Sequence, residues 1–464
     1  MNYLPLFLFT VSFLAFSCKP DESLVAPEPP ETVLQVDTIY RTGELRLGTN
    51  VQLHWLGLDQ DGYITGYQVS VDGDWTLTTR TDSLFSFSIA PGQDTADITI
   101  TVAAMDNDGQ SDPTPATLIV PIKNAPPQVV IDPEGALPDS AFIVITTDWR
   151  AFDTDGDETI EDVELKLNNG PWQSIGTQPG LLSFALSPNG RVGYYINGTL
   201  KDSLDGASTT DPNFLYMRAV DRAGIFSPVD TSKGFLWGHA TEEVLLINGQ
   251  PEYIGPQYKA WMDSTGISYD YLQMDAISGD GIPAYWTPTY DIIMAQYSKI
   301  GLFTDATQFP NNSGTDYLLN ILTLSTQRYL QNGGKLLTCA QLSSGMSGGT
   351  FLEVFPVESL VTSVGQARLT NDSTLQPLFS GYPALRPQNI VLGITPIVPS
   401  ADATALYDGQ LTKIAGWNGT TTMGAVREQN GTVNQVFIAL PLHHFTRPTQ
   451  NGQELLNHIF NAVF

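Results

Sequence analysis

The chain has 464 residues, enough for about three domains, and carries 49 acidic against 21 basic side chains, a formal net charge of −28. A surface this acidic repels nucleic acid and anionic lipid, so a nucleic-acid partner is not expected. The 41 glycines and 31 prolines indicate many turns and favour β architecture.

The N-terminus begins with an apolar stretch, residues 4–17, which has the length of a signal-peptide core and is too short to span a bilayer. Two small residues, Ala15 and Ser17, stand directly before Cys18. This arrangement resembles the lipobox of bacterial lipoproteins, where a signal peptidase cuts before a cysteine whose thiol carries diacylglycerol. The resemblance implies a signal peptide over 1–17 and a lipid on Cys18. An ordinary secretory peptide is the alternative.

Residues 18–34 are polar and rich in proline, which predicts a semi-rigid tether. The tether starts with Lys19-Pro20-Asp21-Glu22, which resembles the charged tag of surface-exported lipoproteins. The predicted location is therefore the outer membrane, with the protein held at the cell surface by its lipid.

A first β-sandwich is predicted over 35–122, because short runs of alternating polarity lie between turn residues. The clearest predicted strands are Val51–Trp55, Tyr67–Val71, Phe85–Ile89 and Ile98–Val102.

A second β-sandwich is predicted over 128–238, because this stretch repeats the order of motifs in the first. Asp59-Gln60-Asp61-Gly62 matches Asp153-Thr154-Asp155-Gly156, and a late strand ends in Ala-x-Asp in both copies. The shared pattern resembles fibronectin type III or immunoglobulin-like modules of bacterial surface proteins. The repeat-equivalent tryptophans, which we expect to pack in the cores, are Trp55, Trp75, Trp149 and Trp172.

The pattern changes over 240–464, where strands and helices alternate and predict an α/β domain with a mainly parallel sheet. The predicted strands are Val244–Ile247, Tyr271–Met274, Tyr290–Ala295, Lys335–Cys339 and Val436–Leu440. The predicted helices are Gln257–Thr265, Asp316–Leu330 and Gly452–Val463. The domain resembles the flavodoxin-like fold of class I glutamine amidotransferases and their non-catalytic relatives.

That resemblance implies a cysteine nucleophile on a glycine-flanked turn, with a histidine and a glutamate two residues apart after a late strand. Cys339 and either His443 or His444 stand at the corresponding positions. However, Thr338 and Ala340 replace the glycine-rich turn, and no carboxylate stands two residues after either histidine. Catalysis by Cys339 is therefore the weaker hypothesis, and a buried, structural cysteine the favoured one.

A metal site is the second candidate. Asp153, Asp155, Asp157, Glu161 and Glu164 fall at the ligand positions of an EF-hand-like calcium loop. Against this hypothesis, Glu158 replaces the glycine that such a loop needs, and the repeat predicts a strand where a helix should follow. The alternative is a set of acidic turn residues that cap the backbone. No cofactor other than calcium is predicted.

A third candidate site is aromatic. Tyr285, Trp286 and Trp417 lie in turn-rich segments outside the repeat and are candidates for contact with a ligand such as a glycan. Together these features predict a non-catalytic, membrane-anchored surface lipoprotein that binds or scaffolds an unknown protein or glycan. The alternatives are a secreted cysteine-dependent hydrolase or amidase and a glycan-capture lipoprotein.

Overall fold

The computed structural model describes residues 27–36, 41–42, 46–187, 191–311, 313–362, 367–409, 412–413, 419–446 and 451–464. The predicted signal peptide, Cys18 and Trp417 lie outside these residues, as does most of the predicted tether. The chain divides into two compact units, Met1–Ala125 and Pro126–Phe464. No helix in the described part of the chain is both long and apolar enough to cross a membrane.

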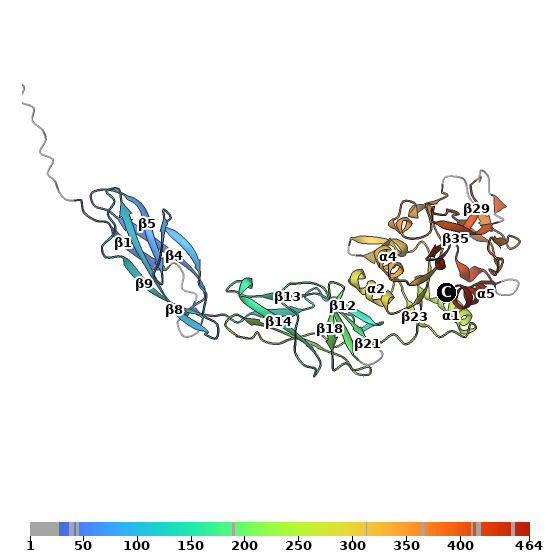
Figure 1. The fold of residues 1–464 in the computed structure, drawn as a ribbon, viewed down its shortest axis with the longest axis horizontal. Helices are drawn as coiled ribbons and strands as arrows, with labels where there is room; N and C mark the ends of the chain where they lie inside the picture. Colours follow the sequence, from blue (N-terminus) through green and yellow to red (C-terminus); the bar gives the residue numbers. More distant parts are fainter. Residues whose placement is uncertain are drawn as a thin grey trace, which may run out of the picture. The chain divides into compact units, whose positions relative to one another are not determined.

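The first unit is a β-sandwich (blue in Figure 1). One sheet has the order β1 (Glu31–Val36), β4 (Asn50–Leu58), β7 (Asp82–Ser86). The other has the order β2 (Arg41–Thr42), β3 (Arg46–Leu47), β9 (Ala116–Lys123), β8 (Thr95–Asp106), β5 (Ile64–Val71), β6 (Asp74–Thr78). Alternate residues of the two sheets, among them Leu53, Tyr67 and Ile100, point inward and form the core.

The second unit begins with another β-sandwich, whose strands lie between residues 128 and 237. Its four-stranded sheets are β12 (Val144–Thr147), β16 (Leu182–Leu186), β17 (Val192–Ile196), β18 (Thr199–Leu204) and β15 (Gln173–Ser174), β14 (Ile160–Leu167), β19 (Leu215–Asp221), β20 (Asp230–Thr231). Two smaller pairs are β10 (Gln128–Ile131) with β13 (Trp149–Phe152) and β11 (Ser140–Ala141) with β21 (Leu236–Trp237). Side chains from several of these sheets share one core that includes Trp149, Val163 and Phe184.

The rest of the second unit is built on one mixed, eight-stranded sheet. Its parallel part is β23 (Asp270–Gln273), β22 (Val244–Asn248), β24 (Lys299–Thr304), β27 (Lys335–Ala340), β36 (Thr432–Ile438). Its antiparallel part continues with β35 (Thr422–Gln429), β33 (Ala403–Gly409), β30 (Leu375–Pro377). The smaller sheets are β25 (Gln308–Asn311) with β26 (Gly314–Tyr317), β28 (Ser359–Leu360) with β32 (Ile397–Val398), and β31 (Val391–Ile394), β29 (Ala367–Leu369), β34 (Thr412–Lys413).

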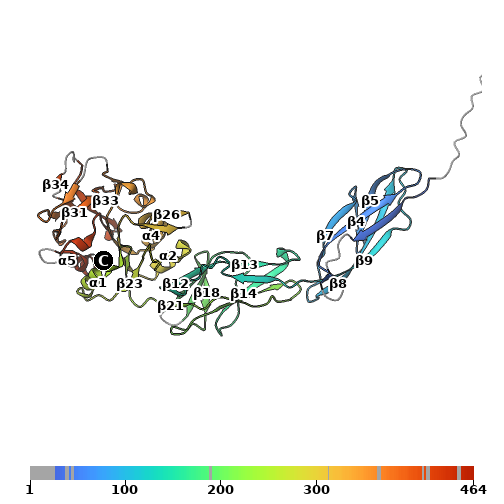
Figure 2. The same cartoon turned by 180° about the vertical axis from the view of Figure 1, so that it is seen from behind.

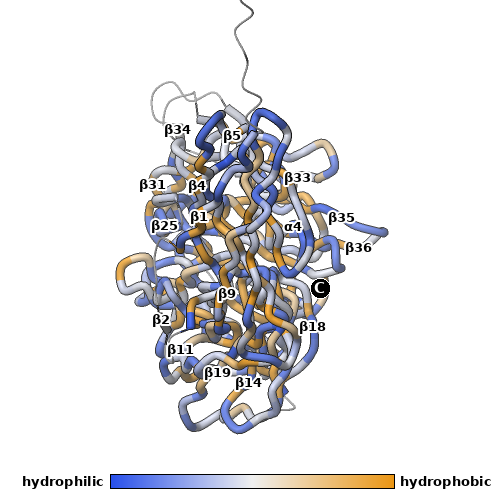
Figure 3. Tube along the Cα trace, turned by 90° about the vertical axis from the view of Figure 1, so that its left-hand side faces the viewer, coloured by the Kyte–Doolittle hydropathy of each residue, from blue (hydrophilic) through white to orange (hydrophobic). Residues whose placement is uncertain are grey.

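Five helices of the described residues pack with this sheet. They are α1 (Gly255–Asp263), α2 (Trp286–Ala295), α3 (Leu318–Ile321), α4 (Thr323–Gln331) and α5 (Asn451–His458). Helix α1 contacts α5, and α2 contacts α4 (Figures 1 and 2). Because right-handed connections from β22 to β23 and from β23 to β24 run in opposite directions, they place α1 and α2 on opposite faces. Along the trace, hydrophobic residues (orange) run through the strands and hydrophilic residues (blue) fill many outer turns (Figure 3).

Helix α2 corrects the sequence prediction, because Tyr290–Ala295 was expected to be a strand. The segment is apolar on several sides, since Tyr290, Ile292, Ile293 and Met294 are all buried. A short run buried all round has no clear period, so strand and helix cannot be told apart by pattern alone.

The same helix joins the second sandwich to the α/β part. Ile143, Val144 and Ala185 of the sandwich belong to the hydrophobic core of the α/β part. Thr146 Oγ1 lies 2.9 Å from Ser183 Oγ and 2.7 Å from Thr289 Oγ1 of α2. Apolar contact and a buried chain of hydroxyls therefore hold these two parts together.

Candidate functional site

The carboxyl ends of the parallel strands are where an open α/β sheet binds ligands, above all where the strand order reverses. Here the order reverses between β22 and β24, and a polar network fills this position. Gln250, directly beyond β22, donates from Nε2 to the Thr304 carbonyl at 3.2 Å. Tyr258 of α1 donates to Gln250 Oε1 at 2.9 Å, and its hydroxyl lies 3.2 Å from Nδ1 of His443. Tyr258 and Thr304 have no exposed surface, and only 2% of Gln250 is exposed.

Cys339 lies inside the sheet, one residue before the end of β27. It stands in register with Phe303 of β24 and Ile438 of β36, and none of its surface is exposed. Burial raises the pKa of its thiol well above the ordinary value, so the neutral form persists. A thiolate nucleophile needs the opposite environment, with a lowered pKa and access to substrate.

The two histidines lie in the turn Leu442–His444, beyond β36. Burial, with a smaller contribution from the neighbouring His444, lowers the pKa of His443 to about 4. Burial also lowers the pKa of His444. The two rings lie 4.2 Å apart, and the described hydrogen bonds of His443 lead to Tyr258 rather than to Cys339.

The residues that replace the orienting carboxylate have other roles. Phe445 is fully buried in the core, and Thr446 donates a hydrogen bond to Gln388. A catalytic acid would stand two residues after one of the histidines. Of these two positions, one holds a residue that packs in the core and the other a residue that hydrogen-bonds to Gln388.

The acidic run predicted as a calcium loop does not form an EF-hand. Asp153 and Asp155 lie in the turn after β13, Asp157 lies in a short 3₁₀ turn, and Glu161 and Glu164 lie on β14. In the described part of the chain, no group of three or more His, Cys, Asp or Glu side chains is arranged to hold a metal ion.

These acidic side chains serve the turn and the sheet. Asp153 accepts from the Asp155 backbone at 2.8 Å, and Asp157 accepts from the Asp153 backbone at 3.0 Å. Glu164 forms an ion pair with Arg218 of the adjacent strand at 2.5 Å. The five predicted ligands are thus divided between the turn and β14, which carries Glu161 and Glu164.

Of the aromatic candidates, Trp286 is a core residue. Its ring stacks on Tyr290 with centroids 5.2 Å apart, and its Nε1 donates to the Pro310 carbonyl at 3.0 Å. Only 7% of its surface is exposed.

Tyr285 instead lines an open groove of about 780 Å³, which we name the Tyr285 groove. The groove is also lined by side chains of the second sandwich, among them Asp148, Arg150, Phe152, Asp157 and Asn197. Burial raises the pKa of the Tyr285 phenol, and the nearby Asp148, Glu134 and Asp132 carboxylates raise it further. The groove thus brings together Tyr285 and Asp157, which the sequence assigned to different sites, with an exposed aromatic side chain, Phe152.

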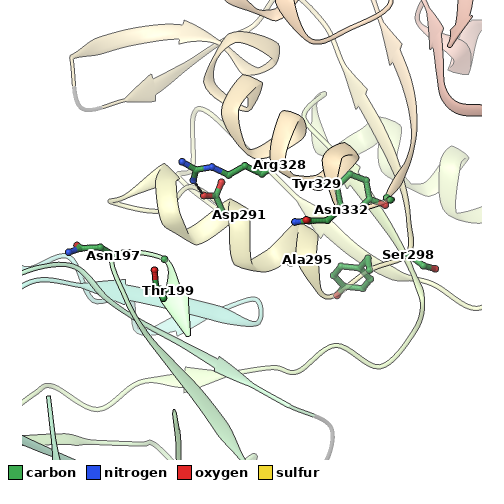
Figure 4. Close-up of a pocket in the computed structure, with 12 residues that line it drawn as sticks. Asn197, Thr199, Asp291, Ala295, Ser298, Arg328, Tyr329 and Asn332 are labelled. Atoms are coloured by element: carbon green, nitrogen blue, oxygen red, sulfur yellow. Dashed lines mark hydrogen bonds and ion pairs between the residues drawn. The ribbon is translucent and has the colours of Figure 1, made fainter. Parts of the chain in front are cut away.

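A second cleft, shown in Figure 4, also has Asn197 in its lining. Its volume is about 710 Å³. Asn197 and Thr199 of the hairpin face Asp291 and Arg328, which form an ion pair (Figure 4). Ser325 also donates to Asp291 at 2.5 Å, so the charge of this carboxylate is satisfied within the protein. The cleft presents amide, hydroxyl and charged groups.

One tryptophan that the repeat predicts to be buried is exposed, and the alternation of polarity along its strand could have predicted this. Trp55 and Trp149 are buried, as expected of repeat-equivalent tryptophans, but 52% of Trp75 is exposed. Trp75 lies on β6, the edge strand of its sheet, beside a Asp-Gly turn. The prediction that Trp75 packs in the core is therefore wrong.

No family model matches this chain, and no curated protein matches it. Among solved structures, the PKD1 domain of Vibrio anguillarum Epp is 18% identical, with a TM-score of 0.16 over 21% of this chain and 98% of that one. The fibronectin(III)-like modules of Clostridium thermocellum CbhA give 18% identity and a TM-score of 0.16, over 20% and 97%. A β-galactosidase from the Antarctic haloarchaeon Halorubrum lacusprofundi is 11% identical, with a TM-score of 0.28 over 47% of this chain and 30% of that one. These scores are low, so the fold described above rests on the strand pairing within the chain itself.

Proposed function

We propose that this protein is a non-catalytic binding or scaffolding lipoprotein of a bacterial cell surface. The observation that carries this proposal is the state of the two groups that would perform thiol chemistry. The Cys339 thiol is enclosed within the central sheet, and the His443 imidazole pairs with the buried hydroxyl of Tyr258.

The energetics of this site support a structural role. Forming a thiolate at Cys339 would place a negative charge in a fully buried position with no hydrogen-bond partner in the described structure, which burial opposes. His443 is neutral at pH 7 because its pKa is about 4, so it cannot supply the positive charge that lowers the pKa of a catalytic thiol. The alternative of a cysteine-dependent hydrolase or amidase receives no support from this geometry.

A binding role is supported by the surfaces that the second unit presents. The Tyr285 groove combines an aromatic side chain with carboxylate, guanidinium and amide groups, which is the mixture of apolar and polar contacts that orients a ligand. The sandwich and α/β parts that form it share buried contacts, so its walls are held in place. Preorganised walls reduce the entropy lost when a ligand binds.

The anchor is the second part of the proposal, and it rests on the Ala15-Phe16-Ser17-Cys18 stretch at the end of the apolar leader. Several acyl chains on Cys18 would hold the protein to the membrane stably, whereas one chain gives only marginal binding. The chain has only two cysteines, so lipidation of Cys18 leaves Cys339 as the sole thiol.

Because Cys339 would be the sole thiol, its reactivity in the folded protein can be tested directly. The purified full chain is treated with a thiol reagent such as iodoacetamide, before and after unfolding in urea. We expect negligible reaction of the folded protein and about one thiol per chain after unfolding. Rapid reaction of folded wild type, lost in Cys339→Ala, would show an accessible thiolate and overturn the proposal.

The anchor is tested by growing cells with an alkyne-bearing fatty acid. We expect label on wild type and on Cys339→Ala, the matched control, and none on Cys18→Ala. Treatment of intact cells with protease should then remove the labelled protein. Label on Cys18→Ala, or protection from protease, would refute the anchor or the surface location respectively.

A further inference from the structure

One face of the first sandwich carries exposed apolar side chains on its edge strand. It is the outer face of strands β6, β5, β8 and β9, and we name it the Trp75 face. Six uncharged residues of this face, of which Ser70 is buried, are Gln68, Ser70, Trp75, Leu77, Thr101 and Thr117. Trp75 is 52% exposed and Leu77 73% exposed.

The strand register explains why these side chains share one face. Ser70 pairs with Trp75 on one side and with Thr101 on the other, and Thr101 pairs with Thr117. Directly opposed residues in antiparallel strands point to the same side of a sheet. The residues adjacent to Ser70 and Gln68 along β5 include Tyr67 and Val69, which point into the core, so the row that starts at Trp75 points outward.

The second sandwich has the equivalent face, but basic side chains contact its tryptophan ring. Both β5 and β14 are followed by a turn residue of positive φ, Asp72 or Asn168, and the tryptophan follows within four residues. Trp172 is the counterpart of Trp75, and Lys166 stands where Ser70 stands.

In the second sandwich, two basic side chains already contact the Trp172 ring. Lys166 Nζ lies 4.9 Å from the centroid of the Trp172 ring, and Arg218 Cζ lies 4.5 Å from it. Arg218 is in turn held by Glu164. The first sandwich has Ser70 and Ala103 at the positions of Lys166 and Arg218, so nothing equivalent covers Trp75.

We propose that the Trp75 face binds an uncharged polysaccharide chain. The open ring of Trp75 and the Leu77 side chain offer apolar contact to the carbon–hydrogen faces of sugar rings. The hydroxyls of Thr101 and Thr117, which hydrogen-bond to each other at 3.2 Å, keep further donor and acceptor capacity for sugar hydroxyls, as does the Gln68 amide. Four strands span about 14 Å at about 4.8 Å between neighbours, which suits several consecutive sugars.

The charge distribution selects this occupant. These six residues carry no charge and the outward-facing Asp97 of β8 is paired with Arg46, although the chain as a whole has a net charge of −28. Acidic polysaccharides, nucleic acid and a second copy of this chain would all meet long-range repulsion, and an uncharged chain would not. A basic protein would be drawn to the carboxylates elsewhere on the surface rather than to this face.

This inference deepens the proposed binding function and rests on it. Its test is affinity electrophoresis of the full chain in a mild non-ionic detergent, in native gels cast with dextran, a soluble β-1,3-glucan, xyloglucan or galactomannan. Alginate serves as the acidic comparison. We expect retardation by at least one neutral polysaccharide and none by alginate.

The variants locate the site. Trp75→Ala should weaken the interaction at least tenfold, Trp75→Phe should retain most of it, and Leu77→Ala should weaken it without affecting folding. Trp172→Ala is the matched control from the equivalent face and should bind as wild type does. Unchanged thermal unfolding of each variant shows that binding, rather than folding, was altered.

Three results would overturn the inference: no retardation by any neutral polysaccharide, equal retardation of wild type and Trp75→Ala, or retardation by alginate alone. Concentration-dependent dimerisation in sedimentation velocity that Trp75→Ala abolishes would assign the face to a second copy and also overturn it. Failure here, with the thiol and lipid experiments as expected, would leave the proposed function standing and reject only the ligand class.

Discussion

The hydroxyl of Tyr258 lies between Gln250 Oε1 at 2.9 Å and His443 Nδ1 at 3.2 Å, and so joins the first parallel strand to the last. The same ring stacks on Phe303 with centroids 3.9 Å apart. A side chain of the protein thus occupies the position where an open α/β sheet commonly holds its ligand.

We expect Tyr258→Phe to destabilise the α/β part by about 1–3 kcal/mol, because the buried Gln250 amide oxygen loses its donor while packing is retained. Urea unfolding followed by tryptophan fluorescence measures the change. Tyr63→Phe, at an exposed tyrosine, is the control and should unfold as wild type does. Equal stability of Tyr258→Phe and Tyr63→Phe would show that the hydrogen bond is replaced by water.

The partly buried His443 predicts a dependence of stability on pH. The folded-state pKa of His443 is about 4, below its ordinary value of 6.5, so the unfolded chain takes up a proton first as the pH falls. Stability is therefore intact above pH 6.5 and is lost progressively between 6.5 and 4, by at most about 3 kcal/mol at 1.36 kcal/mol per unit.

His443→Gln isolates this contribution. The difference in unfolding free energy between wild type and variant should shrink as the pH is lowered from 7 to 4.5, whereas other titrating groups affect both proteins alike. Parallel pH profiles would mean that His443 titrates normally in the folded state.

We expect Cys339→Ser to destabilise the folded protein more than Cys339→Ala does. Cys339→Ala leaves a small cavity, but Cys339→Ser buries a hydroxyl with no acceptor in an apolar sheet, at an additional cost of about 1–3 kcal/mol. Thermal unfolding of the two variants gives the order. A serine variant as stable as alanine would indicate a polar partner or water beside the thiol.

The hydroxyl chain at Thr289 predicts which contact holds the second sandwich to α2. Thr289→Val preserves shape but removes one of the two hydroxyl partners of Thr146 and leaves Ser183, so we expect a loss of about 1–2 kcal/mol and faster proteolysis between residues 238 and 244. Thr117→Val, at an exposed hydroxyl, should change neither quantity. Unaltered proteolysis of Thr289→Val would assign the junction to apolar contact alone.

Chelation of divalent cations should leave the thermal unfolding of wild type unchanged, because Glu164 is engaged by Arg218 and the carboxylates of Asp153 and Asp157 accept backbone hydrogen bonds. Scanning calorimetry with EDTA and with added calcium measures this directly. A rise in the unfolding temperature with calcium that Asp157→Asn abolishes would contradict it.

Much of the architecture could be predicted because alternation of polarity reports one buried face. Val51, Leu53 and Trp55 alternate and are all buried in β4. Alternation of polarity does not predict elements that are buried on more than one side. Tyr290–Ala295 is such a segment and forms a helix, and Thr422–Gln429 joins the central sheet without a clear period.

The sites were harder to predict because they depend on contacts between distant segments. Residue types alone suggested that Cys339 is a buried structural cysteine, which its position inside β27 fits. Nothing local to Tyr285 reveals that it lies beside Asp148, or that Tyr258 occupies the end of the sheet. Repeat equivalence misled for Trp75 because position in a repeat fixes the backbone, whereas neighbouring side chains decide whether the ring is covered.

The core shared by Ile143, Val144 and the α/β residues has a consequence for how such a chain can be rearranged by recombination. A crossover near residue 240 would expose in each product an apolar surface that is buried in the intact chain, and would break the Thr146–Thr289 hydrogen bond, so each product would tend to aggregate. A crossover near Ala125 would separate two units that each keep their own core. The first sandwich can therefore be gained, lost or exchanged between proteins as a cassette, whereas the second sandwich and the α/β part must be inherited together.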